Sequence, residues 1–264
     1  MATRPRLPNN PGPVRGRLFR DLVLLVFVTV GALAAASALL IDDLKHDLAD
    51  ARIGAATALV RDEVRSLLTP VQQQLLIMQD ALRSNDLTPN DTLALNAQMM
   101  PALTHIDQIA GAVFANDLGT EYFLCREDDR WLTRMRPPDG TDAPTFTVNH
   151  WADADEMLDS APATLDHDPR DRPWFRLAAS HLNALPALDQ SDALSWSPPY
   201  RFHELGVPGV TASVAWREDE RLLVAAFDVT LQRIIAAIDA LDLGASGRGF
   251  LFSSDGGVFS SDDD

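Results

Sequence analysis

Cysteine is almost absent from this chain of 264 residues, and the usual signatures of catalysis are missing with it. The single Cys125 excludes an intrachain disulfide, and therefore a small disulfide-stapled scaffold. The six histidines are scattered, and no group has the spacing of metal ligands. The sequence contains no Walker loop, dinucleotide-binding glycine motif or nucleophile elbow. We therefore expect neither an enzyme nor a metal or cofactor site.

The charge of the chain is unevenly distributed. Its formal net charge is -16, yet residues 1–20 carry five arginines and no acidic residue. The rest of the chain is therefore even more acidic than the total, which argues against nucleic acid as a partner. The hydrophobic content of 46% is sufficient for a packed core. Residues 1–20, rich in Arg, Pro and Asn, are expected to form a disordered cytoplasmic tail.

A long uncharged run follows this tail. Leu22 to Ile41 contains no charged residue and is rich in Leu, Val and Ala, which predicts a transmembrane helix over residues 21–41. Arginines precede the run and acids follow it, so the positive-inside rule predicts a cytoplasmic N-terminus and a periplasmic or extracellular body. The alternative is a cleaved signal peptide, because Ala36-Ser37-Ala38 resembles a cleavage site.

Residues 42–91 predict a long helix and the turn after it. Apolar residues recur at spacings of three and four from Leu44 to Leu82, with Pro70 expected to kink or break the helix. A helix of this kind predicts a stalk that pairs two copies of the chain through residues 42–82. A helix that only packs inside its own domain fits the pattern equally well.

Residues 92–228 predict an α+β module built on an antiparallel sheet of about five strands. We expect a helix over 92–103 that stops near Pro101, a short acidic helix over 151–158, and a helix from Arg176 to about Leu182. Strands are expected at residues 108–115, 120–125, 131–136, 210–216 and 221–227.

Residues 229–264 repeat the order of an earlier unit. A helix, an apolar strand, an Asp-x-Gly turn and a second strand occur at 92–123 and again at 229–260. The second copy stops before a sheet can form, which predicts the start of a second, truncated module.

The stretch from His167 to Phe175 contains two arginines, two prolines and two adjacent aromatic residues. A rigid loop that holds a guanidinium beside an indole can bind a carboxylate, or it can simply close a structural corner. A second cluster of aromatics and prolines lies at Trp196 to Tyr200. Asp228, at the end of a predicted strand, and Thr230 are alternative candidate caps for the following helix.

The order of these features resembles the double Cache family, the PAS-like extracytoplasmic sensor domains of bacterial chemoreceptors, histidine kinases and nucleotide cyclases. The resemblance covers residues 20 to 260 and depends on the apolar run, the long helix and several short motifs. These are Asp168-Pro169-Arg170-Asp171-Arg172-Pro173-Trp174-Phe175, Trp196-Ser197-Pro198-Pro199-Tyr200, Gly209-Val210-Thr211-Ala212-Ser213, Phe227-Asp228-Val229-Thr230-Leu231 and Leu243-Gly244-Ala245-Ser246-Gly247-Arg248-Gly249-Phe250-Leu251. The resemblance implies a membrane-distal ligand-binding module followed by a membrane-proximal one, without the effector that complete members carry.

The resemblance also implies a binding site. Arg172 and Trp174 match the pair that binds a ligand carboxylate, and Asp228 matches the acid that holds a ligand ammonium. His167 and Phe175 stand where the amino-acid-binding pattern has tyrosine, so they mark where this pocket departs from the pattern. With Tyr200 nearby, we expect a small carboxylate or amine-bearing metabolite as the ligand, and Arg170 as a structural brace.

Two other functions compete with a sensor. The helix over 42–82 alone would serve a passive, dimerising, membrane-anchored scaffold. An anchored extracytoplasmic hydrolase would need a base beside a nucleophile, and His167 with Ser195 or Ser197 is the candidate pair.

Overall fold

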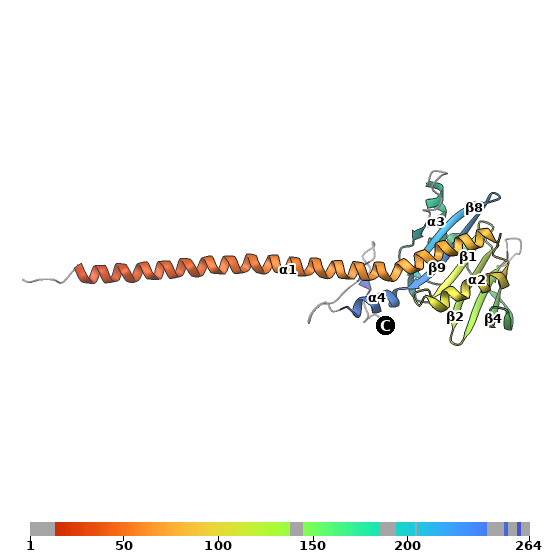
Figure 1. Cartoon of the computed structure of the whole chain (residues 1–264), viewed down its shortest axis with the longest axis horizontal. Coiled ribbons are helices and arrows are strands. Elements are labelled where there is room, and N and C mark those ends of the chain that lie inside the picture. The colour runs from red at the N-terminus through yellow and green to blue at the C-terminus, as the bar shows by residue number, and fades with distance from the viewer. Residues whose placement is uncertain are drawn as a thin grey trace, which may run out of the picture. The chain divides into compact units, whose positions relative to one another are not determined.

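The chain divides into two units, Met1–Ala58 and Leu59–Asp264. The computed structural model describes residues 14–137, 145–184, 194–203, 205–241, 251–252 and 258–259. Helix α1, Val14–Ser84, begins in the first unit and ends in the second (Figure 1). It begins inside the range expected to be a disordered tail, and it continues through Pro70 without a break.

In the first unit, α1 exposes a run of large apolar side chains that includes Leu25, Phe27 and Leu33. Among the described residues, no helix combines the length and the apolarity needed to cross a membrane. Some side chains of the 21–41 segment lie outside the described residues. The transmembrane helix therefore stays a prediction.

In the second unit, the end of α1 packs into the domain core. Val71, Leu75, Met78 and Leu82 are fully or almost fully buried, at the spacings of three and four that the sequence shows. This part of the apolar stripe serves packing within the domain. It is therefore not available to a second copy of the chain.

Helix α2, Thr92–His105, continues past Pro101, where we expected it to stop. A proline inside a helix frees the carbonyl four residues earlier, here that of Ala97. Both Pro101 and Ala97 lie on the exposed side of the helix, so water can satisfy this carbonyl. The buried side of α2, with Leu95 and Met99, holds the helix on the domain.

The described part of the second unit contains a nine-stranded antiparallel sheet, larger than the five strands expected. Its order is β5-β4-β3-β2-β1-β9-β8-β6, and β7 also pairs with β8. The strands are β1 Gly111–Asn116, β2 Glu121–Glu127, β3 Arg130–Arg136, β4 Thr145–Asp153, β5 Glu156–Thr164, β6 Ser195–Trp196, β7 Tyr200–Arg201, β8 Pro208–Glu218 and β9 Arg221–Thr230.

The acidic helix expected over residues 151–158 is wrong. This segment contains the end of β4, a turn and the start of β5. Trp151 is buried in β4, whereas β5 is exposed along most of its length. Acidic residues on an exposed edge strand discourage pairing with another chain, which explains an acidic run in a sheet. Such a run looks like the polar face of a helix when the partner strand is unknown.

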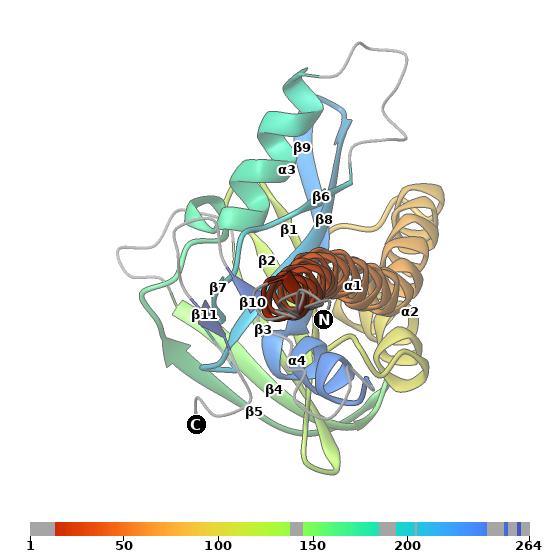
Figure 2. The same cartoon turned by 90° about the vertical axis from the view of Figure 1, so that its left-hand side faces the viewer.

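The two faces of the sheet have different covers, as Figure 2 shows for α2 and α3, Pro173–Ala184. On the α2 face, the hydroxyl of Tyr122 donates to Asn96 Oδ1 at 2.7 Å. On the α3 face, the hydroxyl of Ser213 donates to the Trp174 carbonyl at 3.1 Å. Successive strand residues point to opposite faces. Val113 and Phe123, which pair across β1 and β2, therefore lie on the α3 face.

A short 3-10 helix, η1 Pro169–Asp171, precedes α3. Helix α3 begins at Pro173, three residues before the expected start at Arg176. Proline is favourable in the first helical position because its missing N–H would have no partner there. The two prolines therefore fix the turn that carries Arg172.

The hairpin between β8 and β9 sets the position of Asp228. Asp219 and Glu220 both have positive φ angles, 45° and 66°, as a two-residue hairpin turn of the I′ type requires. The resulting register places Asp228 directly opposite Thr211 and, on its other side, opposite Gly111.

After β9, the chain continues as α4 Leu231–Asp239 and the antiparallel pair β10 Leu251–Phe252 and β11 Val258–Phe259. This is the helix-strand-strand order expected for residues 229–260. The cap of α4 is Thr230, and Asp228 lies inside β9, so a capping role for Asp228 is wrong. The turns expected at 244–247 and 255–257 lie outside the described residues.

Candidate functional site

A small cavity lies on the α3 face of the sheet. Its volume is about 20 Å³, enough for about one water molecule. Its wall combines aromatic, cationic and acidic side chains from β1, β2, β3, β7 and β9, from the start of α3, and from the segments that precede α3 and β8. The lining residues are Val113, Glu121, Phe123, Arg134, His167, Arg172, Trp174, Tyr200, Phe202, His203 and Asp228.

The structure brings five of the six predicted site residues to this cavity, namely His167, Arg172, Trp174, Tyr200 and Asp228. Phe175 does not line it. Its ring is buried in the core and packs edge-to-face on Trp174, with ring centroids 5.6 Å apart. Adjacent residues of a helix point in directions about 100° apart, so the helix that aims Trp174 at the cavity turns Phe175 away.

Arg172 connects the η1 turn to the strands near Tyr200. Its Nη2 donates to the carbonyl of Arg201 at 3.0 Å, and its guanidinium lies 5.2 Å from the centre of the Tyr200 ring. Guanidinium groups stack well on aromatic faces, which holds the charge in a fixed place. Arg172 is half-buried. It therefore offers a positioned cation at the cavity wall.

Asp228 is a buried carboxylate at the same wall. The Thr211 hydroxyl donates to its Oδ1 at 2.6 Å, and the Tyr200 hydroxyl lies 2.7 Å from the same Thr211 oxygen. Burial raises the pKa of Asp228 to about 7, although the hydrogen bond from Thr211 opposes this. Among the described residues Asp228 has no ion-pair partner within reach. A ligand ammonium would supply one.

A second buried carboxylate, Glu121, lies elsewhere on the cavity wall and was not predicted. Its Oε2 accepts from Arg134 Nη2 at 2.9 Å, and its Oε1 lies 2.9 Å from His167 Nε2. Burial alone would raise the pKa of Glu121. The charge of Arg134 and the bond and charge of His167 outweigh burial and lower it to about 2.

We call Glu121, Arg134 and His167 the buried triad. Arg134 is further held between two aromatic rings, 5.1 Å from the centre of Phe123 and 5.3 Å from that of Phe146. The rings of His167 and His203 lie 5.0 Å apart. One sequence signal could have found this group. Glu121 shares its strand face with Phe123 and Cys125, so alternation places it on an apolar face.

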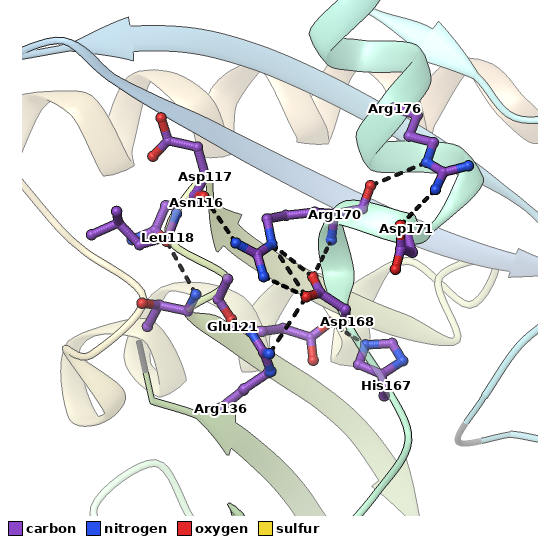
Figure 3. A network of polar contacts seen from close by, with 12 residues as sticks. Asn116, Asp117, Leu118, Glu121, Arg136, His167, Asp168, Arg170, Asp171 and Arg176 are labelled. Carbon is purple, nitrogen blue, oxygen red and sulfur yellow. Dashed lines mark hydrogen bonds and ion pairs between the residues drawn. The ribbon is translucent and has the colours of Figure 1, made fainter. Parts of the chain in front are cut away.

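A separate polar network fixes the loop that carries His167 and Arg172 (Figure 3). Asp168 Oδ1 accepts from both the backbone N–H and the Nε of Arg170, each at 2.9 Å. Arg170 Nη1 also reaches the Asp117 carbonyl at 3.5 Å, and Arg136 lies 3.5 Å from Asp168 Oδ2. The hydrogen bond from Arg170 lowers the pKa of Asp168. These contacts agree with the bracing role expected of Arg170.

The contacts of the serines do not support the hydrolase. The Ser195 hydroxyl lies 2.7 Å from His181 Nδ1, and the Ser197 hydroxyl accepts from the Thr211 backbone N–H at 2.9 Å. His167 bonds to Glu121 instead. Neither serine is therefore paired with the base that this function required.

No protein-family model matches the chain. Over 186 residues the chain is 26% identical to the methyl-accepting chemotaxis protein PctB of Pseudomonas aeruginosa, an alignment that covers 64% of this chain and 28% of PctB. The chain thus spans less than a third of the length of this curated relative.

Two solved structures are similar to this one. One is the ligand-binding domain of the amino acid chemoreceptor PctB of Pseudomonas aeruginosa with L-Gln (TM-score 0.51, 20% identity, 80% of this chain and 67% of that domain). The other is the ligand-binding domain of the Pseudomonas fluorescens chemoreceptor CtaA with L-alanine (TM-score 0.51, 16% identity, 80% and 71%). The chain therefore has the fold of bacterial chemoreceptor ligand-binding domains, which confirms the resemblance to double Cache sensors.

Proposed function

We propose that the chain is a sensor domain that binds a small metabolite with a carboxylate and an amine group in the cavity between Arg172 and Asp228. The observation that carries this proposal is that a positioned cation and a buried carboxylate, which forms no ion pair within the described part of the chain, lie at one cavity. The similar domains are sensors rather than enzymes, and their structures contain amino acids.

Different side chains would bind the two charged groups of the ligand. Arg172 would bind the ligand carboxylate, because a guanidinium offers two parallel donors to it. Asp228 would bind the ammonium, which would supply the missing counter-charge of a buried acid. Trp174 and Tyr200 would form the walls, and Tyr200 also holds Thr211 against Asp228.

The cavity must enlarge before a metabolite of this size can enter. Its present volume of about 20 Å³ suits about one water molecule. His203 lies at the cavity and is exposed, so its side chain can move at little packing cost. Side-chain rearrangement at interfaces is common when ligands bind.

The membrane anchor and the periplasmic location form the second part of this proposal. The exposed apolar side chains of α1, among them Phe27 at 75% and Leu33 at 74%, would find a suitable solvent in lipid. A reporter enzyme that is active only outside the cytoplasm, fused after residue 241, would report the location. Activity that disappears when residues 21–41 are deleted supports the anchor, and unchanged activity contradicts it.

Pairing of two copies through the 42–82 helix is also proposed. Leu59, Leu76 and Ile77 remain exposed on α1 and face away from the buried Val71 and Leu75. Analytical ultracentrifugation of the 42–264 fragment tests this pairing, with Ile77→Asp as the disrupting variant. A monomer in the wild type contradicts it.

The binding function is tested by titrating amino acids, amines and small carboxylates into the protein and following heat and thermal stability. Arg172→Ala and Asp228→Asn are expected to reduce the affinity of every ligand that binds the wild type. Arg176→Ala, on the exposed side of α3, and Asp239→Asn, on the exposed side of α4, are the matched controls. Failure of the whole panel to bind, or equal binding by Arg172→Ala, contradicts the proposal.

A further inference from the structure

One polar atom at the cavity is buried without a hydrogen-bond partner. His167 is 8% exposed and lines the cavity, and its Nδ1 has no partner among the described residues. The ring of His203, whose centre lies 5.0 Å from that of His167, supplies none. Burying a polar nitrogen without a partner is costly. Because this nitrogen belongs to the cavity wall, it is a candidate ligand contact.

The contacts of the other ring nitrogen decide which role Nδ1 can take. Nε2 lies 2.9 Å from Glu121 Oε1 and 3.3 Å from Arg134 Nη2. The lowered pKa of Glu121 keeps its carboxylate ionised, and an ionised carboxylate only accepts hydrogen bonds. A proton on Nε2 satisfies the shorter contact, whereas a lone pair there would face another acceptor at 2.9 Å. In the neutral ring the proton is therefore on Nε2, and Nδ1 carries a lone pair.

The charges around the ring favour this neutral form. Arg134 Nη2 donates to Glu121 Oε2 at 2.9 Å, so the fold already balances the buried carboxylate with a cation. A second proton on the imidazole would leave the buried triad with a net positive charge, which is costly away from water. Nδ1 is therefore a hydrogen-bond acceptor, and the group that completes it must be a donor.

This acceptor belongs to a different part of the cavity wall from Asp228. Asp228 pairs with Gly111 on β1, whereas Glu121 pairs with Ala115. The four residues of strand from Gly111 to Ala115 correspond to about 13 Å. The buried triad and Asp228 therefore meet the cavity from different positions along β1. A ligand whose ammonium lies at Asp228 would meet the acceptor with its side chain.

We propose that His167 Nδ1 accepts a hydrogen bond from the side chain of the ligand, so that the ligand is a neutral amino acid whose side chain ends in a donor, such as a carboxamide or a hydroxyl. This inference rests on the proposed function and deepens it by naming the ligand class. The α-carboxylate and the α-ammonium keep the places at Arg172 and Asp228, and the side chain adds the third contact.

Other side chains would suit this part of the cavity less well. A hydrocarbon would leave the buried Nδ1 unpaired. A carboxylate would set a second acceptor against it. A cationic side chain could donate, but Glu121 already pairs with Arg134, so the added charge would be buried without a counter-charge from the triad. A neutral donor satisfies the nitrogen and adds no charge.

Two series of L-amino acids test this class, and every member carries the α-carboxylate and α-ammonium on which the proposed function depends. L-Asparagine, L-aspartate and L-leucine have side chains of similar size, and those of L-glutamine, L-glutamate and L-methionine are longer. Isothermal titration of the intact chain at pH 8, where a free imidazole is neutral, tests both series. At one of the two lengths, the carboxamide is expected to bind at least about ten-fold more tightly than its carboxylate and hydrocarbon counterparts.

His167→Gln is the variant that removes the acceptor. The amide of glutamine can donate to Glu121 from the place of Nε2, but it leaves no nitrogen at the place of Nδ1. In this variant the carboxamide is expected to lose its advantage, so that the ratio of affinities falls close to one. His105→Gln, at an exposed position of α2, is the matched control that keeps the ratio.

The outcomes separate this inference from the function on which it rests. A carboxamide that binds no more tightly than the hydrocarbon at either length would show that solvent satisfies Nδ1, and it overturns the inference. Tightest binding by the carboxylate, a ratio unchanged by His167→Gln, or binding only by amino acids outside both series also overturns it. Each of these results leaves the Arg172–Asp228 site standing.

Failure of both series and of every other amino acid, amine and carboxylate overturns the proposed function itself. If His167→Gln does not fold, the comparison of the three side chains in the wild type decides alone.

Discussion

Glu121 and Asp228 are both buried carboxylates on the same face of one sheet, yet their pKa values move in opposite directions. The pKa of Glu121 falls to about 2, whereas that of Asp228 rises to about 7. Burial acts on both in the same direction. The difference comes from Arg134 and His167, each 2.9 Å from an oxygen of Glu121, while Asp228 receives a hydroxyl hydrogen bond from Thr211 at 2.6 Å. One carboxylate is already paired within the fold, and we propose that the other binds the ligand.

The first prediction removes the charge of Glu121, the carboxylate that is already paired with Arg134. Glu121→Gln leaves Arg134 and His167 buried without their acid, and removing one partner of a buried pair costs about 3–5 kcal/mol of unfolding free energy. Urea denaturation at pH 7 measures this loss. Glu127→Gln is the control, because its side chain is 44% exposed and its pairing with Arg130 is worth about 0–1 kcal/mol. Equal losses in the two variants would remove the distinction.

The second prediction removes the charge of Asp228 in the same way and expects the opposite effect on stability. Asp228→Asn removes a buried charge that forms no ion pair with any described residue, so the unfolding free energy at pH 7 should stay equal or increase. Affinity for an amine-bearing ligand should fall by about 2–5 kcal/mol, as when one partner of a buried charge pair is lost. Denaturation and calorimetry on the same preparations compare the two effects. A destabilised Asp228→Asn that keeps full affinity would show that Asp228 is structural.

The third prediction concerns the pH dependence of stability. Because the pKa of Asp228 is raised in the folded state, folding takes up a proton between about pH 4 and pH 7, and stability falls as the pH rises through this window. The contribution is at most about 1.4 kcal/mol per pH unit. Glu121 acts at lower pH, where its stabilising contribution is lost as the pH falls from about 4.5 toward 2.

Asp228→Asn and Glu121→Gln are expected to change different parts of this dependence of stability on pH. Thermal unfolding between pH 3 and pH 8 should show that Asp228→Asn flattens the upper window and leaves the lower one, while Glu121→Gln does the reverse. A profile in which both variants change the same window would contradict the assignment of the two pKa values.

The sequence predicted Asp228 but missed Glu121, and the reason is physical. Asp228 sits in a short motif of consecutive residues, whereas Glu121 becomes meaningful only when Arg134 from the next strand and His167 from a distant loop meet it. In a sequence, a polar residue within a strand can equally be one whose side chain faces solvent. The alternation of Glu121 with Phe123 and Cys125 was the one local sign of burial.

The same distinction between local and distant interactions explains which elements of the fold could be predicted. The helices and the hairpins near the predicted strands were recognised from period and turn residues, because those interactions are local. Strands β4 and β5 were missed because the exposed, acidic β5 has no apolar face of its own. Whether Trp174 or Phe175 faces the cavity depended on the helix start at Pro173. The residues before that start decide it, and the pattern after it does not.

The central claim is that a ligand ammonium ionises Asp228, and the number of protons released on binding tests it most directly. Titration of the tightest-binding monocarboxylic amino acid at pH 7, in two buffers of different ionisation enthalpy, yields this number. With a pKa of about 7, Asp228 is about half protonated before binding, so the wild type should release roughly half a proton and Asp228→Asn none. Binding without proton release in the wild type, or equal release in Asp228→Asn, would contradict the account.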